Sequence, residues 1–404
     1  MADFSSLDVD GKTVLVRVDF NVPLDGDGSI TDDTRVRGAL PTIRSLLDRG
    51  AAVVLMSHLG RPQKKKRDDG SVDREKFSVK PAAVRLGELL DVAVKTADDV
   101  GGPDAQQKAA DLRPGEVLLI ENTRFEPGEE RGDRELAERL AGLGDVYVND
   151  AFGAAHRAHA STTTVAEFFG ADAKAAGLLM AKELEAGQRL LDDPGRPFVA
   201  ITGGAKVSDK VLLLEQLIEK ADAVIIGGGM AYTFIKARGG SIGTSLLEPD
   251  LLGKAREVLA KAEARGVAIY LPTDNVCTQE FAPDAAAATY PSDAIPDGWG
   301  GLDIGVESRK LFHGVVVNAK TILWNGPMGV FEFEKFAAGT YAVAEAVVEA
   351  TDNGAYSLIG GGDSASAITQ GGYADRVSFV STGGGAMLEL LEGRTLPGVA
   401  AIEE

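Results

Sequence analysis

The sequence predicts an α/β fold with two doubly wound domains, each a parallel sheet with helices on both faces, joined by a helical hinge. Short runs of Val, Ile and Leu recur along the 404 residues and alternate with helical stretches, as in parallel sheets covered by helices. In the C-terminal half, five such runs end in glycine-rich or polar clusters: 197–210, 222–234, 321–332, 356–367 and 377–389. Ligands of open α/β sheets lie at the carboxyl ends of strands, where glycine lets a phosphate approach backbone N–H groups. This pattern therefore indicates a nucleotide site assembled from several loops.

The N-terminal half repeats the alternation with a different chemistry at the strand ends. Strands are expected at 13–20, 51–58, 116–122 and 145–152, and one more strand of the C-terminal half at 267–274. Helices are expected at 39–50, which ends on a glycine, and at 210–221. The N-terminal strand ends carry polar and charged side chains instead of glycine: Asp19, Asn21, His58, Arg61, Asn122, Arg124 and Asp150.

A boundary between the two halves is expected after residue 176. The predicted domains are 1–176 and 192–392, with one long helix over 177–191 as the connection and a Pro- and Gly-containing stretch opening the second domain. The charged segment 63–78 is interpreted as a solvated loop and not as a nucleic-acid patch, because acidic residues interrupt its basic run.

Composition narrows the functional classes. The formal net charge of −19 argues against a general nucleic-acid or anionic-membrane binder, so an anionic substrate would need a local basic cluster. The single cysteine, Cys277, excludes a disulfide framework within the chain and fits a reducing cytoplasm. The N-terminus lacks the features of a signal peptide, and no apolar stretch reaches the ~18 residues of a membrane span. A cytoplasmic location is expected.

Four polar residues at the first two strand ends are open to two interpretations. Asp19 and Asn21 either share a face of a binding site or form a turn by bonding their own backbone, and the turn is favoured from these residues alone. His58 and Arg61 offer two donors to an anion, although a histidine at a strand end is equally often a satisfied buried residue.

Arg35 and Arg37 stand at the start of a helical stretch. They either project into a cleft or form surface ion pairs with Asp32 and Asp33, and on their own the surface pairs are the more common outcome.

Arg124 and Arg157 add guanidinium groups to the same half. Because guanidinium binds both phosphate and carboxylate in a bidentate manner, several such donors at strand ends fit a site for a phosphorylated acid. A zinc site at His156 and His159 is disfavoured, since the lone Cys277 does not complete a ligand set at suitable spacing.

Lysine and glycine patterns in the C-terminal half favour phosphate binding without a standard fingerprint. Lys206 and Lys210 are four residues apart and so share one helix face. The segment lacks the GxxxxGK[ST] pattern of a P-loop, and no strand leads into GxGxxG, which disfavours a dinucleotide site.

Other polar residues of this half have both a structural and a binding interpretation. Asp363 follows three glycines and is either a plain helix N-cap or an oxygen ligand for Mg²⁺. Asn325 and Glu332 could meet sugar hydroxyls, and the glycines of 383–386 expose N–H groups to an anion.

Read together, these segments resemble the phosphoglycerate kinase family. The resemblance rests on an ordered set of motifs from about residue 12 to 392: RVDFNVPLD, LPTI, SHLGRP, ENTRF, NDAFGAAHRAHAST, GGAKVSDK, GGGMAYTF, WNGPMGVFE, GGGDSASA and STGGGAMLELL. It implies reversible, Mg²⁺-dependent phosphoryl transfer between 1,3-bisphosphoglycerate and ADP, giving 3-phosphoglycerate and ATP, in glycolysis. It also implies a monomer without nucleic-acid or membrane partners, whose C-terminal tail (393–404) packs on the N-terminal domain.

The resemblance carries residue roles onto matching positions. It implies that 3-phosphoglycerate is bound by Asp19, Asn21, Arg35, His58, Arg61, Arg124 and Arg157. It implies that Mg-ATP or Mg-ADP is bound by Lys210, Gly227, Gly228, Gly229, Gly301, Asn325, Glu332, Gly361, Gly362, Asp363 and Ser364, with Asp363 on the metal. The candidates for stabilising the transferring group are Arg35, Lys206, Gly383, Gly384 and Gly385. The family roles overturn the turn and surface-pair interpretations for Asp19, Asn21 and Arg35, and leave Arg37 as a surface residue.

Three other functions remain as alternatives. A kinase of a different small carboxylate would keep the nucleotide residues but lose the basic set of the N-terminal half. A catalytically inactive nucleotide-binding protein would not need Lys206 and Asp363. A nicotinamide-dependent dehydrogenase is disfavoured by the missing dinucleotide fingerprint.

Overall fold

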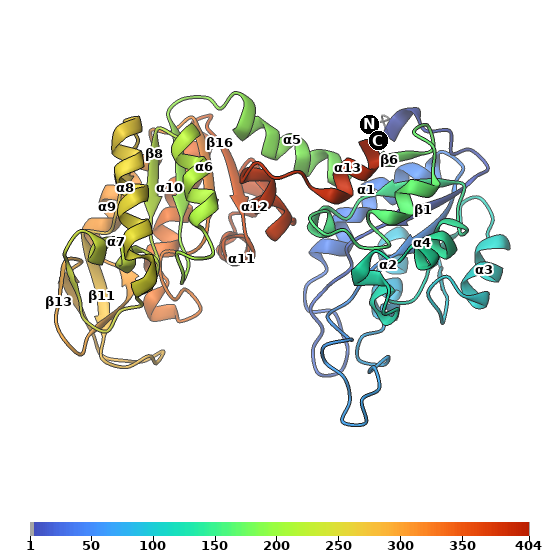
Figure 1. Cartoon of the computed structure of the whole chain (residues 1–404), viewed down its shortest axis with the longest axis horizontal. Coiled ribbons are helices and arrows are strands. Elements are labelled where there is room, and N and C mark those ends of the chain that lie inside the picture. Colours follow the sequence, from blue (N-terminus) through green and yellow to red (C-terminus); the bar gives the residue numbers. More distant parts are fainter. Residues whose placement is uncertain (1–3, 404) are drawn as a thin grey trace. The chain divides into compact units, whose positions relative to one another are not determined.

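The computed structural model describes residues 4–403 and divides the chain into two compact units (Figure 1). The first unit contains the described residues up to Leu184 together with those from Thr395 onward, and the second is Glu185–Arg394. The division falls inside helix α5 (Leu178–Asp192), which coincides with the long helix expected at 177–191.

The first unit is built on a six-stranded parallel sheet with strand order β3-β4-β2-β1-β5-β6. Its strands are Thr13–Arg17 (β1), Ala52–Met56 (β2), Val94–Thr96 (β3), Val117–Leu119 (β4), Val146–Asn149 (β5) and Lys174–Ala176 (β6). Strands β2, β4 and β3 lie on one side of β1, and β5 and β6 lie on the other side, so the strand order reverses between β1 and β5. Loops leave the sheet in opposite directions at such a reversal, so the carboxyl ends of β1 and β5 flank a natural ligand position.

The second unit repeats the architecture with strand order β10-β8-β7-β15-β16-β17, again all parallel. The strands are Phe198–Thr202 (β7), Ala223–Ile226 (β8), Ala268–Tyr270 (β10), Thr321–Asn325 (β15), Tyr356–Gly360 (β16) and Phe379–Val380 (β17). The order reverses between β7 and β15, which places the glycine-rich ends of these strands at the switch point. The predicted fold class of two doubly wound parallel sheets is confirmed.

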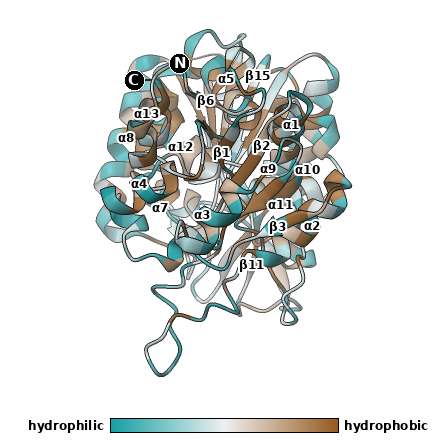
Figure 2. Ribbon diagram, turned by 90° about the vertical axis from the view of Figure 1, so that its right-hand side faces the viewer, coloured by the Kyte–Doolittle hydropathy of each residue, from teal (hydrophilic) through white to brown (hydrophobic). Residues whose placement is uncertain are grey.

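Helices cover the sheets and explain the buried strand faces. They are Thr34–Asp48 (α1), Lys80–Leu90 (α2), Pro103–Ala110 (α3), Arg134–Ala141 (α4), α5, Val211–Lys220 (α6), Ala231–Ala237 (α7), Leu252–Arg265 (α8), Val306–Val316 (α9), Ala338–Asp352 (α10), Gly362–Gln370 (α11), Gly385–Leu391 (α12) and Pro397–Glu403 (α13). Every residue of β2, β7 and β15 is buried, as expected for strands covered on both faces. In Figure 2 strands such as β1 and β2 are largely brown, whereas α4 and α8 show much teal.

Two small sheets of the second unit were not predicted from the sequence. Strands Asp274–Thr278 (β11), Ala287–Pro291 (β12) and Gly300–Ile304 (β14) form an antiparallel sheet, and Ser241–Ile242 (β9) pairs with Ala294–Ile295 (β13). Their burial alternates or is partial, so the strands lack the continuous apolar runs that mark the large sheets.

The C-terminal segment belongs to the first unit. Gly398 donates its N–H to the Ala155 carbonyl oxygen at 2.8 Å, and its own carbonyl accepts from Asn149 Nδ2 at 3.2 Å. In Figure 1 the red helix α13 lies beside β6 accordingly. Within residues 4–403, no helix combines the length and the apolar character needed to cross a bilayer.

Candidate functional site

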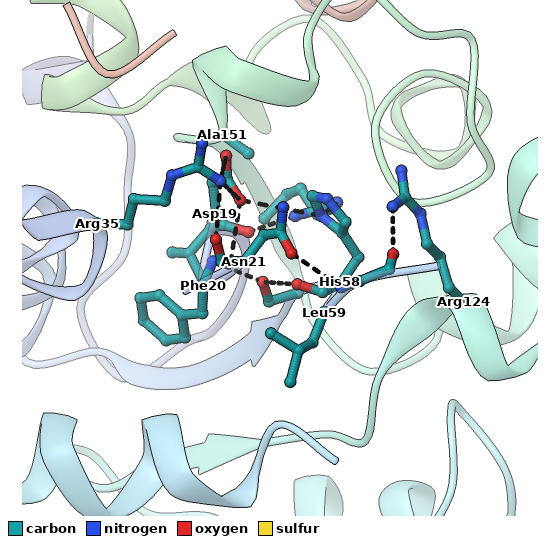
Figure 3. A network of polar contacts seen from close by, with 12 residues as sticks. Asp19, Phe20, Asn21, Arg35, His58, Leu59, Arg124 and Ala151 are labelled. Atoms are coloured by element: carbon teal, nitrogen blue, oxygen red, sulfur yellow. Dashed lines mark hydrogen bonds and ion pairs between the residues drawn. The ribbon is translucent and has the colours of Figure 1, made fainter. Parts of the chain in front are cut away.

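The first unit gathers its polar strand-end residues into one network, shown in Figure 3. Asp19 and Asn21 follow β1, and His58 follows β2, its hydrogen-bonded neighbour. Arg35 reaches this group from one side, and Arg124 lies on the other side of His58. Parallel pairing explains the convergence, because it brings successive strands to the same sheet edge at their carboxyl ends.

Arg35 is turned toward the strand ends and away from its acidic sequence neighbours. Its Nη1 lies 3.3 Å from Asp19 Oδ1 and 3.2 Å from Oδ2, and donates to the Asn21 carbonyl oxygen at 3.0 Å. Arg37, two residues later on α1, instead pairs with Asp33 at 2.8 Å on the surface. Arg35 therefore faces the strand ends and Arg37 forms a surface ion pair, which are the two arrangements that the sequence left open for both residues.

Asn21 and Arg124 hydrogen-bond to the backbone of Gly60 on its two sides, one to its N–H and the other to its carbonyl oxygen. The Gly60 N–H donates to Asn21 Oδ1 at 2.8 Å, and Arg124 Nη1 donates to the Gly60 carbonyl oxygen at 2.6 Å. Arg124 is almost fully buried, and its Nε has no hydrogen-bond partner within the described residues. Burial, followed by the neighbouring charge of Arg157, lowers the pKa of Arg124 to about 10, so this guanidinium remains charged near neutral pH.

Arg17 is a site residue that sequence reasoning missed. It is the last residue of β1, is fully buried, and donates through Nη2 to His58 Nδ1 at 3.0 Å. Because a guanidinium can only donate, His58 Nδ1 must accept and its proton must sit on Nε2. Arginine in the middle of VLVRVDF was a signal, since a charge inside a buried apolar strand requires partners.

A buried acid, Glu129, is linked to Arg17 through the hydroxyl group of Ser161. Arg17 Nε donates to Ser161 Oγ at 2.8 Å, and that hydroxyl donates to Glu129 Oε1 at 2.5 Å. Glu129 is fully buried and also accepts the Ser161 N–H at 3.0 Å. These hydrogen bonds hold the Arg17 side chain in place, and Arg17 in turn holds His58.

The charges around His58 define what this site can bind. The pKa of His58 lies well below its ordinary value because of burial, reinforced in decreasing order by Arg17, Arg124, Arg157 and Arg35. His58 is therefore neutral, and the guanidinium groups nearby supply the positive charge. Arg157 donates through Nε to His156 Nε2 at 3.0 Å, and the Arg61 side chain is exposed. Fixed cations of this density suit a ligand with several negative charges.

The second unit contains two neighbouring cavities that share Gly204, Ala205 and Asp363 in their walls. The larger has a volume of about 500 Å³, and the smaller about 380 Å³. Both lie at the carboxyl ends of the strands around the β7/β15 switch point. An elongated ligand can therefore place one end in each cavity, with its middle part beside Asp363.

The larger cavity has a mainly glycine and apolar wall. Of the residues singled out from the sequence, Gly228, Gly229, Gly301 and Glu332 line it. The apolar side chains that complete it were missed from sequence: Tyr232, Leu246, Phe281, Leu302, Met328 and Val330. The unpredicted antiparallel sheet supplies part of this wall through the ends of β11 and β14. A cavity of this volume, lined by glycines and apolar side chains with a few polar groups, suits a nucleobase.

Close backbone approach explains one of these glycines. Gly228 has φ of +64°, and a Cβ there would lie 2.6 Å from the Gly204 nitrogen. Any side chain at this position would push the β7 and β8 loops apart and open the wall between them.

The smaller cavity is lined by charged and polar side chains and glycines, with two lysines and two aspartates, Asp209 and Asp363, among them. Of the residues singled out from the sequence, Lys206, Lys210, Asn325, Gly361, Gly362, Asp363, Ser364, Gly384 and Gly385 line it. Lys210 Nζ donates to Asn325 Oδ1, and burial lowers the pKa of Lys210 although Asp209 and Asp363 act in the opposite direction. The Asn325 Nδ2 atom is buried and unpaired among the described residues, which leaves a donor beside this cavity.

Asp363 is an exposed carboxylate in the first turn of α11, where both cavities meet. The residue before the helix, Gly361, has a φ of +86° that an L-residue rarely adopts. The neighbouring Ser364 hydroxyl accepts the Gly326 N–H at 2.5 Å and so ties α11 to the end of β15.

Two glycines singled out from the sequence lie differently from the rest. The Gly227 N–H donates to the Thr202 carbonyl oxygen at 2.8 Å, and the Gly383 N–H donates to Ser381 Oγ at 3.1 Å. Neither residue lines either cavity. The next glycine in each loop, Gly228 and Gly384, lines a cavity instead.

A two-domain α/β phosphotransferase is the class of protein that this fold and these paired sites define. The chain belongs to the phosphoglycerate kinase family: the family described as "Phosphoglycerate kinase" matches residues 4–394. Enzymes of this family transfer a phosphoryl group to the carboxyl group of 3-phosphoglycerate. The predicted family, enzyme class and glycolytic function are confirmed.

Relatives match over essentially the whole chain. The phosphoglycerate kinases of Synechococcus sp. (strain CC9311) and Nostoc punctiforme are 52% and 53% identical over 404 residues, which is 100% of this chain and 98% of each relative. The solved structure of phosphoglycerate kinase from Coxiella burnetii has a TM-score of 0.85 at 41% identity, covering 98% of this chain and 97% of that one. The Pyrococcus horikoshii OT3 enzyme has a TM-score of 0.84 at 32% identity, covering 100% and 98%.

Proposed function

We propose that the two units of this phosphoglycerate kinase divide the substrates, with the acid bound in the first unit and the nucleotide in the second. The single observation that carries this division is the contrast in charge. Four guanidinium groups lie near His58 in the first unit, whereas the second unit has a cavity with many apolar and glycine residues beside one lined by glycines, two lysines and two aspartates.

The acid site would hold 3-phosphoglycerate or 1,3-bisphosphoglycerate. The residues proposed to bind it are Asp19, Asn21, Arg35, His58, Arg61, Arg124 and Arg157. Arginine forks match both the phosphate and the carboxylate of this ligand, and the His58 Nε2 proton adds a neutral donor. Asn21 and Arg124 would act partly by holding Gly60, the residue before Arg61.

The nucleotide site would hold ATP or ADP with its base in the larger cavity and its phosphates in the smaller. Glu332 is proposed to bind ribose hydroxyls, and Lys210 and the 361–364 loop to contact phosphates. The positive end of the α11 dipole and the glycine backbone of Gly384 and Gly385, which line this cavity, support phosphate placement there.

Magnesium enters as part of the nucleotide substrate, and Asp363 is the residue proposed to hold it. Within residues 4–403, no group of three or more His, Cys, Asp or Glu side chains could form a metal cage. One exposed carboxylate beside a phosphate cavity nevertheless fits Mg²⁺, which usually keeps several waters and binds through one or two carboxylates plus substrate phosphates.

The chemistry requires charge stabilisation and no general base. The attacking group in the ATP-consuming direction is a carboxylate, which needs no deprotonation. Negative charge spreads over the equatorial oxygens of the transferring phosphoryl group, and Arg35 and Lys206 are proposed to meet it with the Gly384 and Gly385 N–H groups. The Gly383 N–H already donates to Ser381 Oγ, so a share in this role would require that bond to open.

Because the two substrates are assigned to different units, a closing motion is proposed to bring them together and to exclude water from the reaction. Helix α5 and the loop before α12 are the proposed hinge elements. Small-angle scattering should show greater compaction with both substrates than with either alone, and an unchanged profile would contradict the motion.

A monomeric state is proposed from the family resemblance. A cytoplasmic location is proposed from the single cysteine, and the absence of nucleic-acid or membrane partners from the −19 charge. Analytical ultracentrifugation should give a mass near the 42.2 kDa of one chain. A larger mass would contradict the monomer.

A coupled assay tests the proposed roles. With 3-phosphoglycerate and Mg-ATP, and glyceraldehyde-3-phosphate dehydrogenase with NADH to consume the acyl phosphate, turnover should require both substrates and Mg²⁺. Arg35→Ala and Lys206→Ala should each lower kcat by about 10²–10³. If both variants keep kcat within about threefold of wild type, the assignment is wrong.

A further inference from the structure

Glu248 holds the backbone of the loop that carries Lys206. Its Oε2 accepts the N–H groups of Val207 at 2.5 Å and Ser208 at 3.1 Å. Its Oε1 accepts the Ser208 hydroxyl at 2.6 Å. One carboxylate therefore fixes two consecutive peptide units directly after Lys206, although 40 residues separate it from Ser208 along the chain.

The backbone before Lys206 is held as well, at Gly204, two residues earlier in the chain. The Gly204 N–H donates to the Pro327 carbonyl oxygen at 3.1 Å, and the Gly204 carbonyl accepts from the Met230 N–H at 3.0 Å. Lys206 thus lies on a short span held at both ends, while its own side chain is exposed and forms no ion pair in the part of the chain described. Lys206 lines the smaller cavity, and the backbone held on both sides of it fixes where the side chain starts.

Glu248 is itself tied to the nucleotide-facing wall. Its N–H donates to Thr233 Oγ1 on α7 at 3.2 Å, and Leu246, two residues earlier, lines the larger cavity. Burial opposes ionisation of Glu248, but the Ser208 hydroxyl, the Ser208 and Val207 N–H groups and the charge of Lys206 outweigh it and lower its pKa. The carboxylate is therefore charged at neutral pH and bonds strongly to the loop.

We propose that Glu248 is a positioning residue for phosphoryl transfer, which acts by holding the Val207 and Ser208 peptides so that Lys206 meets the transferring group. The inference rests on the proposed role of Lys206. Glu248 acts through the loop backbone and does not touch the substrate, so its removal should lower kcat more than it raises the KM for Mg-ATP. A loss of order 10²-fold is typical for a misplacement of about 1 Å, and a partly held loop should lose about tenfold or more.

A double-mutant cycle tests the proposal. Glu248→Ala should lower kcat about tenfold or more with the KM for Mg-ATP within about twofold of wild type. Lys206→Ala should lower kcat by about 10²–10³. The double variant should be no slower than Lys206→Ala alone, because a lysine that is absent cannot be misplaced. Glu248→Gln, which can still accept one N–H bond, should fall between Glu248→Ala and wild type.

Asp99 provides the matched control. Its carboxylate accepts three backbone N–H groups in the first unit: Gly102 and Ala105 on Oδ1 and Asp104 on Oδ2. Asp99→Ala should lower the midpoint of thermal unfolding while kcat stays within about twofold of wild type.

Several outcomes separate this inference from the proposed function. Glu248→Ala with wild-type kcat would overturn the inference, and so would a double variant whose loss is the product of the two single losses. In both cases a slow Lys206→Ala variant would leave the role of Lys206 intact. Lys206→Ala with wild-type kcat would overturn both. If Glu248→Ala fails to fold, the same comparison is made with Glu248→Gln alone and in combination with Lys206→Ala.

Discussion

The two candidate sites differ in the groups that form them: hydrogen-bonded side chains in the first unit and mostly backbone in the second. In the first unit, charge is set by side chains locked to one another: buried Arg17 fixes His58, and Asn21 and Arg124 clamp Gly60. In the second unit, the walls are mostly backbone, and the charged groups Lys206 and Asp363 are exposed at the ends of glycine loops. We therefore expect loss of a buried group such as Arg17 to lower folding stability most, and loss of an exposed group such as Lys206 or Asp363 to lower activity with little change in stability.

The largest effect is expected at Arg17, where the first site is most deeply buried. Arg17→Met removes the donor to His58 Nδ1 and Ser161 Oγ and leaves the fully buried Glu129 uncompensated. Breaking a buried charge network from one side destabilises by about 3–5 kcal/mol. Urea unfolding should show a loss of this size, whereas half-exposed Arg35→Met should lose less than about 1 kcal/mol. Equal losses would remove the distinction between buried and exposed arginines.

The second unit should show the opposite pattern at Asp363. Asp363→Asn removes the carboxylate proposed to hold Mg²⁺ but no buried contact, so the free energy of unfolding should stay within about 0.5 kcal/mol of wild type. Calorimetric titration should find ADP binding with Mg²⁺ weakened about tenfold, and binding in EDTA nearly unchanged. Weakening of the same size in EDTA would show that Asp363 does not act through the metal.

A backbone change in the second unit should give a smaller, stability-based effect. Gly361→Ala forces a side chain into a φ of +86° and places Cβ 2.8 Å from Asn325 Nδ2, which should destabilise by about 1–2 kcal/mol. The neighbour Gly362 is the control, because a Cβ there meets nothing within 4 Å. If Gly362→Ala is as destabilising as Gly361→Ala in urea, local strain is not the cause.

A pH-dependent effect of similar size is one that both units should share. Asp150 in the first unit accepts the Leu179 N–H at 2.9 Å, and Asp303 in the second accepts the Gly339 N–H at 2.7 Å. Burial raises the pKa of each carboxyl to about 7. The folded protein thus keeps these protons up to about pH 7, whereas the unfolded chain releases them near its ordinary pKa of 3.8. Unfolding therefore releases protons in this window, and stability falls as pH rises through it.

Asn substitutions test this shared feature. Relative to wild type, Asp150→Asn and Asp303→Asn should each become more stable between pH 5 and 7, by about 1 kcal/mol per pH unit. Urea unfolding at several pH values measures the difference. A difference that does not change with pH would show that the carboxyls are already ionised in the folded protein.

The sequence predicted the large sheets well because their strands are continuous apolar runs. The strands expected at 13–20, 51–58 and 321–332 correspond to β1, β2 and β15, all buried and central or nearly so. The edge strands β3 and β6 were missed, since their sequences, VKT and KAA, contain a lysine and no run of large apolar residues. The antiparallel β11, β12 and β14 have five residues each but lack a continuous apolar run, so they were missed, and with them one wall of the larger cavity.

The candidate site residues could be found where they stand in a motif, but not where they act through space. His58 and Lys206 lie at strand ends in recognisable segments. Arg17 lies inside a strand, and its meaning depends on pairing β1 with β2. Glu248 contacts Ser208 across 40 residues of chain, which local periodicity does not encode.

The central claim is that the acid and the nucleotide are bound by different units, and crossed binding measurements test it most directly. Titration calorimetry would measure the affinity of Arg35→Ala and Asp363→Ala for 3-phosphoglycerate and for Mg-ADP. We expect Arg35→Ala to weaken 3-phosphoglycerate binding about tenfold or more while leaving Mg-ADP binding within about twofold of wild type, and Asp363→Ala to do the reverse. If either variant weakens both ligands to the same extent, the division of substrates between the units is wrong.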